Sequence, residues 1–211
     1  MTIDHIGHIL YPDLIILRII GRLAFPLFAY LVAIGLKSTR KPKKYILSLL
    51  IFGFISQISY FTAFNIQPFE RLNIFFSLFL GVLTIYYFKK RSFLAFAPII
   101  LSLVFNNTIE GSFYVVLTIL FMNLLLENKT TGALALSALN FSSLFESNTQ
   151  ATIQVFALIA LPIILLHLSN RFKFEIIISD RSLFYILRKY FFYVYYPLHL
   201  TLLFLIAPFF Y

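Results

Sequence analysis

The stretch MTIDHIGHILYPDLIILRIIGRLAFP, residues 1–26, decides the fold. Two apolar segments meet here at a turn formed by Tyr11, Pro12 and Asp13. Five ionisable side chains interrupt the apolar residues, three before the turn and two after it: Asp4, His5, His8, Arg18 and Arg22. Ionisable groups are costly inside a bilayer, and where they occur there they mark functional sites. We therefore expect a helical hairpin whose charged residues face one another.

The composition excludes an ordinary soluble domain. Of the 211 residues, 61% are hydrophobic and 12% are charged, whereas soluble domains contain about 25% charged residues. The chain has no cysteine, which excludes disulfides, thiolate metal sites and a cysteine nucleophile. The net charge of +9 would suggest nucleic acid in a soluble protein, but here the cations cluster in short loops between apolar segments. The sequence predicts an integral, multi-pass protein of the cell membrane, with the lipid bilayer as its partner, no metal and no nucleic acid.

The apolar segments predict an all-α, polytopic bundle of transmembrane helices in a single domain, residues 1–211. A spanning helix needs about 20 apolar residues, and the candidates cover residues 13–36, 44–64, 72–88, 92–106, 113–126, 132–145, 152–168 and 189–208. Residues 1–11 are half that length, so we expect either a half-helix or, as the favoured interpretation, a natural start upstream of Met1. In total, about eight or nine spans are expected, the first one incomplete. Residues 174–188 do not fit a span and are expected to form an interfacial segment.

Alternate loops differ in charge, and the difference predicts the orientation. One set of loops carries most of the cations, within residues 37–44, 89–91, 129, 171–173 and 181–189. The other set contains the acidic residues Asp13, Glu70, Glu110 and Glu146. The positive-inside rule places the basic loops, and with them the N-terminus, in the cytoplasm and the C-terminus outside. The basic loop KSTRKPKK, residues 37–44, also suits the phosphates of a nucleotide cofactor, although orientation and attraction to anionic lipid are the stronger interpretation.

The hairpin has the side chains of a reaction centre. Residues equally far from the turn lie at equal depth, so His5 is level with Arg18 and Arg22, about 9–15 Å below the turn. Asp4 and His8 are four residues apart and share one helix face. Because histidine exchanges a proton near neutral pH, His5, oriented by Asp4, is a candidate general base, and an adjacent arginine can stabilise an oxyanion or bind a phosphate. The spacing leaves His5 and His8 both possible, with the deeper His5 favoured, and a charge cluster that only locks the helices together is the alternative.

Three further polar residues are expected at membrane depth. Gln57 lies in the middle of the 44–64 segment and can either line the same cavity or make an interhelical hydrogen bond. Asn73 begins the 72–88 segment at the outer face. His199 lies in YYPLHLTLL, just after Pro197, and a proline inside a helix kinks it. His199 is therefore a second candidate site residue, with a structural role as the alternative.

At these residues the chain resembles the TraX family, membrane proteins named for the N-terminal acetylation of conjugative pilin. The resembling stretches are MTIDHIG, LRIIGRLAFPLFAYLVAIG, YILSLLIFGFISQISY, RLNIFFSLFLG and FYVYYPLHL. They cover most of residues 1–88 and 190–200, and the segments between them are generic hydrophobic helix. The pairing of DHIG with GRLAFP is the most specific part of the resemblance.

The resemblance implies an integral membrane acyltransferase that transfers an acetyl group from acetyl-CoA to an amine or hydroxyl. It further implies catalytic roles for Asp4, His5 and Arg22. The residues implied to bind substrate or cofactor are His8, Arg18, Gln57, Asn73 and His199. The acceptor is left open among a protein N-terminus, a peptide and a glycan, because the pilin substrate does not carry over. The family also resembles, in its use of an early histidine and arginines, the larger membrane acyltransferases of cell-surface glycans.

Two other functions remain possible from the sequence. Intramembrane Asp, His and Arg side chains also serve proton relays, so a proton-coupled transporter or permease is the first alternative. Such transporters commonly have repeated halves, and no internal repeat is visible here. A structural subunit of a larger membrane assembly is the second alternative.

Overall fold

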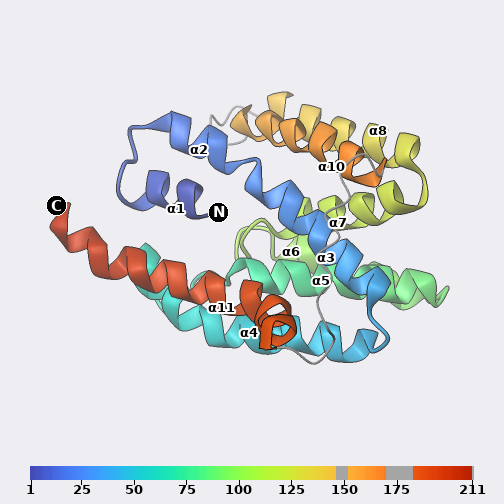
Figure 1. The fold of residues 1–211 in the computed structure, drawn as a ribbon, viewed down its shortest axis with the longest axis horizontal. Coiled ribbons are helices and arrows are strands. Elements are labelled where there is room, and N and C mark those ends of the chain that lie inside the picture. The colour runs from blue at the N-terminus through green and yellow to red at the C-terminus, as the bar shows by residue number, and fades with distance from the viewer. Residues whose placement is uncertain (146–151, 170–182, 211) are drawn as a thin grey trace.

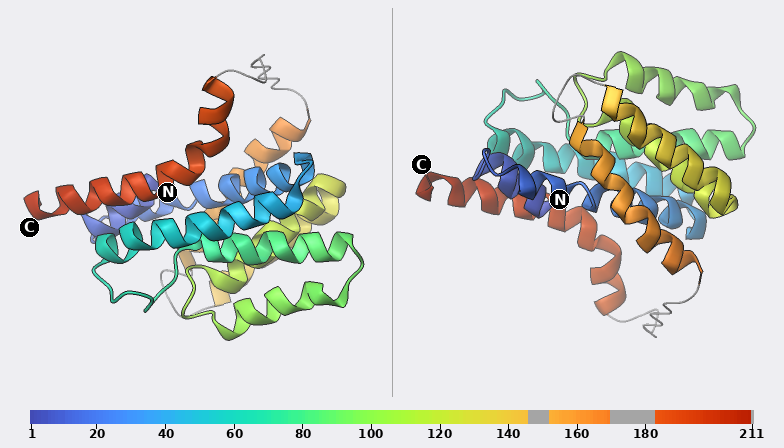
Figure 2. Two further views of the ribbon diagram at one scale, coloured as in Figure 1. Left: turned by 90° about the horizontal axis from the view of Figure 1, so that it is seen from below. Right: turned by 90° about the horizontal axis from the view of Figure 1, so that it is seen from above.

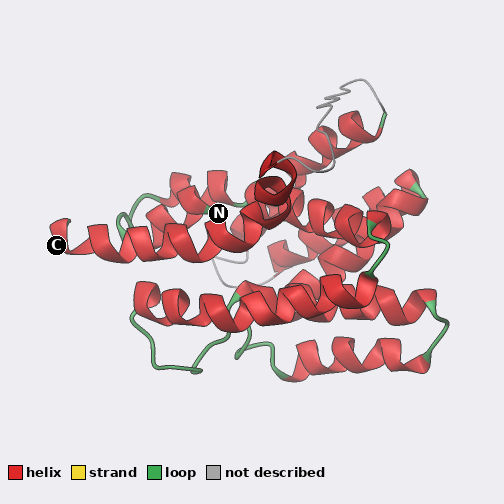
Figure 3. Ribbon diagram, turned by 60° about the horizontal axis from the view of Figure 1, so that its bottom comes forward, coloured by secondary structure: helices red, strands yellow, loops and turns green. Residues whose placement is uncertain are grey.

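The computed structural model describes residues 1–145, 152–169 and 183–210 of the chain. Within these ranges the regular structure is helical, as Figure 3 shows by colour, and the all-α prediction is confirmed. The elements follow in the order α1 (Thr2–Ile9), α2 (Ile15–Gly21), α3 (Ala24–Ser38), α4 (Pro42–Phe64), α5 (Ile74–Lys89), η1 (Phe93–Ala95), α6 (Phe96–Val104), α7 (Ser112–Glu127), α8 (Lys129–Ser142), η2 (Ser143–Phe145), η3 (Ile153–Ile159), α10 (Ala160–Leu168), α11 (Leu183–Ile206) and η4 (Ala207–Phe209).

In the described part of the chain, three helical stretches are long and apolar enough to cross a membrane: Ile15–Ser38, Pro42–Phe64 and Tyr190–Phe209. Shorter apolar helices cover Ile74–Lys89, Phe93–Val104, Ser112–Glu127 and Ile153–Leu168. A helix of 16 residues, the length of α5 and of α7, extends only about 24 Å. The membrane-helix character of the chain is thus confirmed, while the number of eight or nine spans stays a prediction.

The span expected over residues 13–36 is found as Ile15–Ser38, but it consists of two helices and not of the one continuous helix that was predicted. The chain leaves regular helix at Arg22 and Leu23, between α2 and α3. Pro26 lies in the first turn of α3. A proline ring clashes with the carbonyl group four residues earlier, here that of Arg22, and contributes no N–H to the helix. The break therefore falls where Pro26 requires it.

The core lies between α3, α5 and α7, with α5 at its centre (Figure 1). Ten of the 16 residues of α5 are buried, as expected for a helix surrounded by others. Gly81 of α5 allows the close approach of α7, because a Cβ atom there would lie 2.7 Å from Ile119 Cδ1. Figure 2 shows α11 as a bent helix along one side of the bundle. It contains Pro197, which leaves the carbonyl of Tyr193 without its helical partner and weakens that turn.

An apolar stripe on α4 faces away from the bundle. Leu47, Ile51, Phe54, Ile55 and Ile58 are each between 47% and 65% exposed. They recur at spacings of three and four residues, which places them on one side of the helix. A large exposed apolar surface of this kind is typical of an interface with lipid or with another protein, in agreement with a membrane protein.

The loops gather at two ends of the molecule. The α3–α4 and α5–α6 connections, which hold the basic residues 37–44 and 89–91, lie at one end (Figures 1 and 2). The turn between α1 and α2 and the C-terminus lie at the other end, where the rings of Tyr11 and Phe210 are 5.8 Å apart. The turn and the C-terminus therefore lie at the same end of the bundle, while their side of the membrane stays a prediction. Of the expected interfacial segment 174–188, residues 174–182 lie outside the described part, and residues 183–188 belong to α11.

Candidate functional site

The hairpin of α1 and α2 is closed by two glycines. A Cβ atom on Gly21 would lie 2.3 Å from Asp4 Cβ and 2.7 Å from Asp4 Cα, and one on Gly7 would lie 2.8 Å from Leu17 Cβ. Only glycine permits such contact between helices. The predicted hairpin is thus present, and Gly21 brings Asp4 directly against the backbone of α2.

Asp4 pairs with Arg18 across the hairpin. The Arg18 guanidinium lies 3.3 Å from the Asp4 carboxylate and also donates a hydrogen bond of 3.2 Å to the Asp4 backbone carbonyl. The Arg18 side chain is 13% exposed and the Asp4 side chain 19%. The structure therefore brings together the opposite charges that the sequence placed at matching depth, and neutralisation lowers the cost of burying them.

His5 is bound to His199 of α11. His5 is 5% exposed and His199 4%. The Nδ1 atom of His5 lies 2.9 Å from Nε2 of His199, and Nδ1 of His199 lies 2.9 Å from the backbone carbonyl of Tyr195. Asp4, expected to orient His5, instead faces Arg18, because neighbouring residues on a helix point about 100° apart. The side chain that orients His5 comes from the other end of the chain.

Aromatic rings enclose His5. Phe64 at the end of α4 lies edge-on at 5.5 Å between ring centroids, and Tyr196 lies at 6.3 Å. His8 contacts the same Phe64 ring at 5.4 Å but is itself exposed. Burial and a fixed hydrogen bond thus favour His5 over His8 as the ordered imidazole.

Arg22 follows Gly21 at the junction of α2 and α3. It is partly buried, and its neighbours within electrostatic range include Asp4, Arg18 and Glu110. The hairpin therefore contributes two guanidinium groups and one carboxylate to the same region, so its positive charge exceeds its negative charge.

Gln57 and Asn73 form a second hydrogen-bond network. The Gln57 amide accepts hydrogen bonds from the backbone and side-chain nitrogens of Asn73, at 3.1 and 2.8 Å, and donates to the Arg71 carbonyl at 2.7 Å. Asn73 also donates to the Gly53 carbonyl and caps α5 by accepting from Phe75 N–H. These bonds hold the loop after α4 against the helix. A substrate-binding role for Gln57 and Asn73 stays a prediction, and the contacts favour a structural one.

Glu110 is a candidate that the sequence reasoning missed. Its carboxylate accepts hydrogen bonds from Ile74 N–H at the start of α5, at 3.1 Å, and from the Tyr196 hydroxyl at 3.3 Å. The loop of Glu110 pairs with the loop after α4 through Leu72, whose carbonyl accepts from Glu110 N–H at 2.8 Å. Burial raises the pKa of this carboxyl to about 6. In the sequence, Glu110 served only as an orientation signal, although an acid in a short apolar loop is itself unusual.

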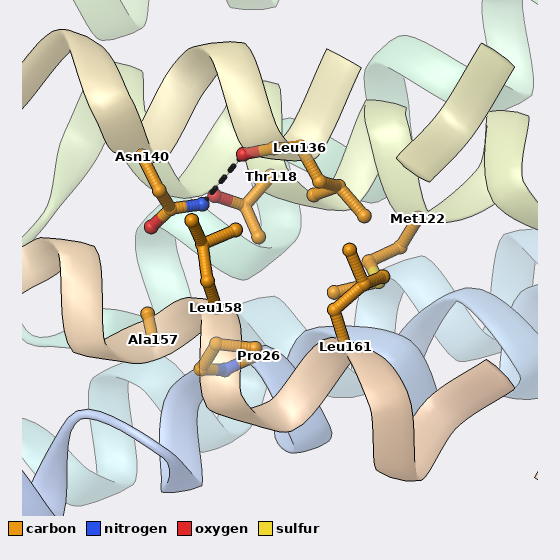
Figure 4. A pocket seen from close by; sticks show the side chains of 8 residues that line it. All are labelled: Pro26, Thr118, Met122, Leu136, Asn140, Ala157, Leu158 and Leu161. Carbon is orange, nitrogen blue, oxygen red and sulfur yellow. Dashed lines mark hydrogen bonds between the residues drawn. The ribbon is translucent and has the colours of Figure 1, made fainter. Parts of the chain in front are cut away.

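Two cavities lie away from the histidine pair. One, between α3, α7, α8 and η3–α10, has a volume of about 10 Å³ and is lined by Thr118, Met122 and Asn140 among others (Figure 4), which suits one water molecule. The other is a groove of about 330 Å³ between α4 and α5, with Lys43 and Lys90 in its lining. Neither cavity is lined by residues of α1 or α2, and the channel from the cytoplasm to the hairpin that a cytoplasmic donor would need stays a prediction. Within the described ranges, no three histidine or acidic side chains gather into a possible metal site.

Comparison with known proteins gives a family over nearly the whole length. The sequence profile of a family described as "TraX protein" matches residues 1–207. An uncharacterized protein, RP591 of Rickettsia prowazekii (strain Madrid E), is 46% identical over 90 residues, which are 43% of this chain and 34% of that relative. The match thus spans about a third of the length of the relative. No solved structure matches the chain.

Proposed function

Because the chain belongs to the TraX protein family, we propose that it is a membrane-embedded acyltransferase in which His5 is the general base. The observation that carries the proposal is the buried hydrogen bond between His5 and His199. It holds an imidazole in one orientation beside the Asp4–Arg18 pair. A fixed imidazole and a cationic neighbour are the groups that acyl transfer needs.

The donor in this proposal is acetyl-CoA, and the acceptor is an amine or hydroxyl of a protein N-terminus, a peptide or a glycan. His5 removes a proton from the acceptor, whose nitrogen or oxygen then bonds to the acetyl carbon. The carbon–sulfur bond breaks, and the leaving thiolate takes up the proton that His5 removed, which returns His5 to its neutral form. Arg22 binds the donor through a phosphate or the thioester oxygen, and it stabilises the negative charge that develops on that oxygen, as donors in an oxyanion hole do.

Asp4 supplies two functions in this scheme. One carboxylate oxygen, Oδ2, pairs with Arg18 and keeps that guanidinium against α1. The other, Oδ1, is buried and has no hydrogen-bond partner within the part of the chain that the structure describes. A buried oxygen without a hydrogen-bond donor is costly, and the amine or hydroxyl group of the acyl-acceptor substrate could donate a hydrogen bond to it. His8, exposed on the same face of α1, is placed to contact the substrate.

The cytoplasmic supply of acetyl-CoA sets the proposed orientation. The end that holds residues 37–44 and 89–91 faces the cytoplasm, in accordance with the positive-inside rule. The hairpin turn and the C-terminus then face the outside. The reacting groups lie nearer the outer face, so the donor must enter from the basic end, and an acceptor on the cell surface can approach from the other.

Calorimetric titration of acetyl-CoA into the purified protein in detergent tests the proposal. We expect saturable binding that Arg22→Ala weakens about 10- to 100-fold, the loss typical of a charged hydrogen bond. Lys89→Ala, which removes a cation at the end of α5, is the matched control and should leave binding unchanged. Binding that Arg22→Ala does not affect would move the donor to residues 37–44. No binding at all would refute the acyltransferase and favour a transporter.

A further inference from the structure

We infer that His199 is a positioning residue that holds His5 in one tautomer, with the proton on Nδ1 and the lone pair on Nε2. The inference deepens the proposed function, on which its catalytic meaning rests. The hydrogen-bond chain itself is a property of the structure and can be tested without any activity.

The series of hydrogen bonds that fixes His5 begins at the backbone carbonyl of Tyr195. This oxygen lies 2.9 Å from His199 Nδ1. A carbonyl can only accept a hydrogen bond, so His199 Nδ1 must carry a proton and donate it. In a neutral imidazole only one ring nitrogen carries a proton. The other nitrogen of His199, Nε2, therefore has its lone pair free to accept.

The second hydrogen bond of this series fixes the position of the proton on His5. His5 Nδ1 lies 2.9 Å from His199 Nε2. Since His199 Nε2 accepts, His5 Nδ1 must donate, and the proton of neutral His5 is on Nδ1. The lone pair of His5 is then on Nε2, the ring nitrogen that points away from His199. The hydrogen bond made by one ring nitrogen thus decides which nitrogen is basic.

The packing of the rings holds this arrangement in place. The planes of His5 and His199 differ by 3°, with centroids 5.1 Å apart. The His199 ring also stacks on Tyr195, at 5.1 Å and 18°. The Tyr195 hydroxyl in turn shares a hydrogen bond with the Thr2 hydroxyl, which ties this part of α11 to the start of α1. Both rings are buried, where a charged imidazolium would be costly, so the neutral pair is the favoured state.

The neighbouring carboxylate does not perform this function. Asp4 precedes His5 directly, but its side chain pairs with Arg18. In many enzymes a carboxylate fixes the tautomer of a catalytic histidine. Here a second histidine, 194 residues away in the sequence, takes that position. A histidine can do so only because the Tyr195 carbonyl fixes its own proton.

Two substitutions of His199 separate hydrogen bonding from packing. In His199→Gln, the amide oxygen reaches the position of Nε2 and can still accept from His5. In His199→Phe, a ring of similar size remains but no acceptor does. Nitrogen-15 NMR of histidine-labelled protein in detergent reports the tautomer, and the His5 signal is identified by its absence in His5→Gln.

We expect the proton of His5 on Nδ1 in the wild type and in His199→Gln, and its shift to Nε2 in His199→Phe. Acetyl transfer should fall about 10- to 100-fold in His199→Phe and much less in His199→Gln, at similar thermal midpoints. A wild-type His5 protonated on Nε2 would overturn the inference, even where His199→Phe does not fold. Transfer unchanged in His199→Phe would overturn the catalytic part. The expected tautomers without any acetyl transfer would support the inference and refute the proposed function.

Discussion

Gly21→Ala, which adds a single methyl group, should greatly reduce acetyl transfer by displacing α1. The new Cβ atom would lie 2.3 Å from Asp4 Cβ, and α1 would have to retreat by about 1 Å to reach the 3.4 Å of ordinary contact. The Asp4–Arg18 contact of 3.3 Å crosses this α1–α2 interface, and the His5–His199 bond of 2.9 Å joins α1 to α11, so a movement of α1 would alter both. Overpacking costs about 1–3 kcal/mol, and the better helix propensity of alanine offsets about 1 kcal/mol of it. The net loss of stability is therefore modest, about 0–2 kcal/mol.

Activity is the sharper assay of this substitution. A misplacement of about 1 Å can lower a rate about 100-fold, so acetyl transfer in Gly21→Ala should fall by about that factor. Gly53→Ala is the matched control, a buried glycine in α4 whose new Cβ atom would meet Phe76 and Phe75 at 3.3 and 3.4 Å. It should change both thermal midpoint and transfer little. Wild-type transfer in Gly21→Ala would refute the argument that the hairpin spacing positions the site.

Three further predictions concern the surroundings of the site. Asn73→Ala removes the cap of α5 and a partner of Gln57, so the free energy of unfolding should fall by about 2–3 kcal/mol in denaturant titrations; an equal loss in the exposed Asn107→Ala would contradict this. The pKa of Glu110, about 6 against a usual 4.5, means that its protonated form stabilises the fold below pH 4.5 and that this stability is lost as pH rises through 6. The thermal midpoint of Glu110→Gln should therefore vary less with pH between pH 4.5 and 7, where the free energy of unfolding of the wild type falls by about 1–2 kcal/mol. The same pH dependence in wild type and variant would contradict the raised pKa. Because the chain has no cysteine, Lys44→Cys and Glu70→Cys should react with a membrane-impermeant thiol reagent from opposite sides of the membrane, and labelling from the same side would refute the topology.

The positions of the helices could be predicted because each spanning helix requires a continuous apolar segment of about 20 residues, and such segments can be located in the sequence. The segments 44–64 and 113–126 correspond to Pro42–Phe64 and Ser112–Glu127. The break between α2 and α3 was missed, although Pro26 encodes it. The family, read from a few motifs, is confirmed over residues 1–207.

The sequence predicted which residues belong to the site better than it predicted which of them contact one another. Depth along a hairpin brings Arg18 to Asp4, and this contact follows from spacing alone. His199 could be recognised as a candidate, but a single sequence does not show which of the later helices packs against α1. The bond between His5 and His199 joins the two ends of the chain, and Glu110 comes to the site from the loop before α7, with a hydrogen bond from Tyr196. Such contacts depend on tertiary packing, which apolar periodicity does not encode.

The central claim is that His5 drives acetyl transfer, and release of the CoA thiol from acetyl-CoA measures it most directly. The assay would use purified protein in liposomes, with a peptide amine and glucosamine as acceptors and a thiol-reactive dye as readout. The absence of cysteine removes any background from the protein itself. We expect acceptor-dependent thiol release by the wild type and its loss by at least about 100-fold in correctly folded His5→Ala, as for other general bases. Release at the wild-type rate in His5→Ala would contradict the account.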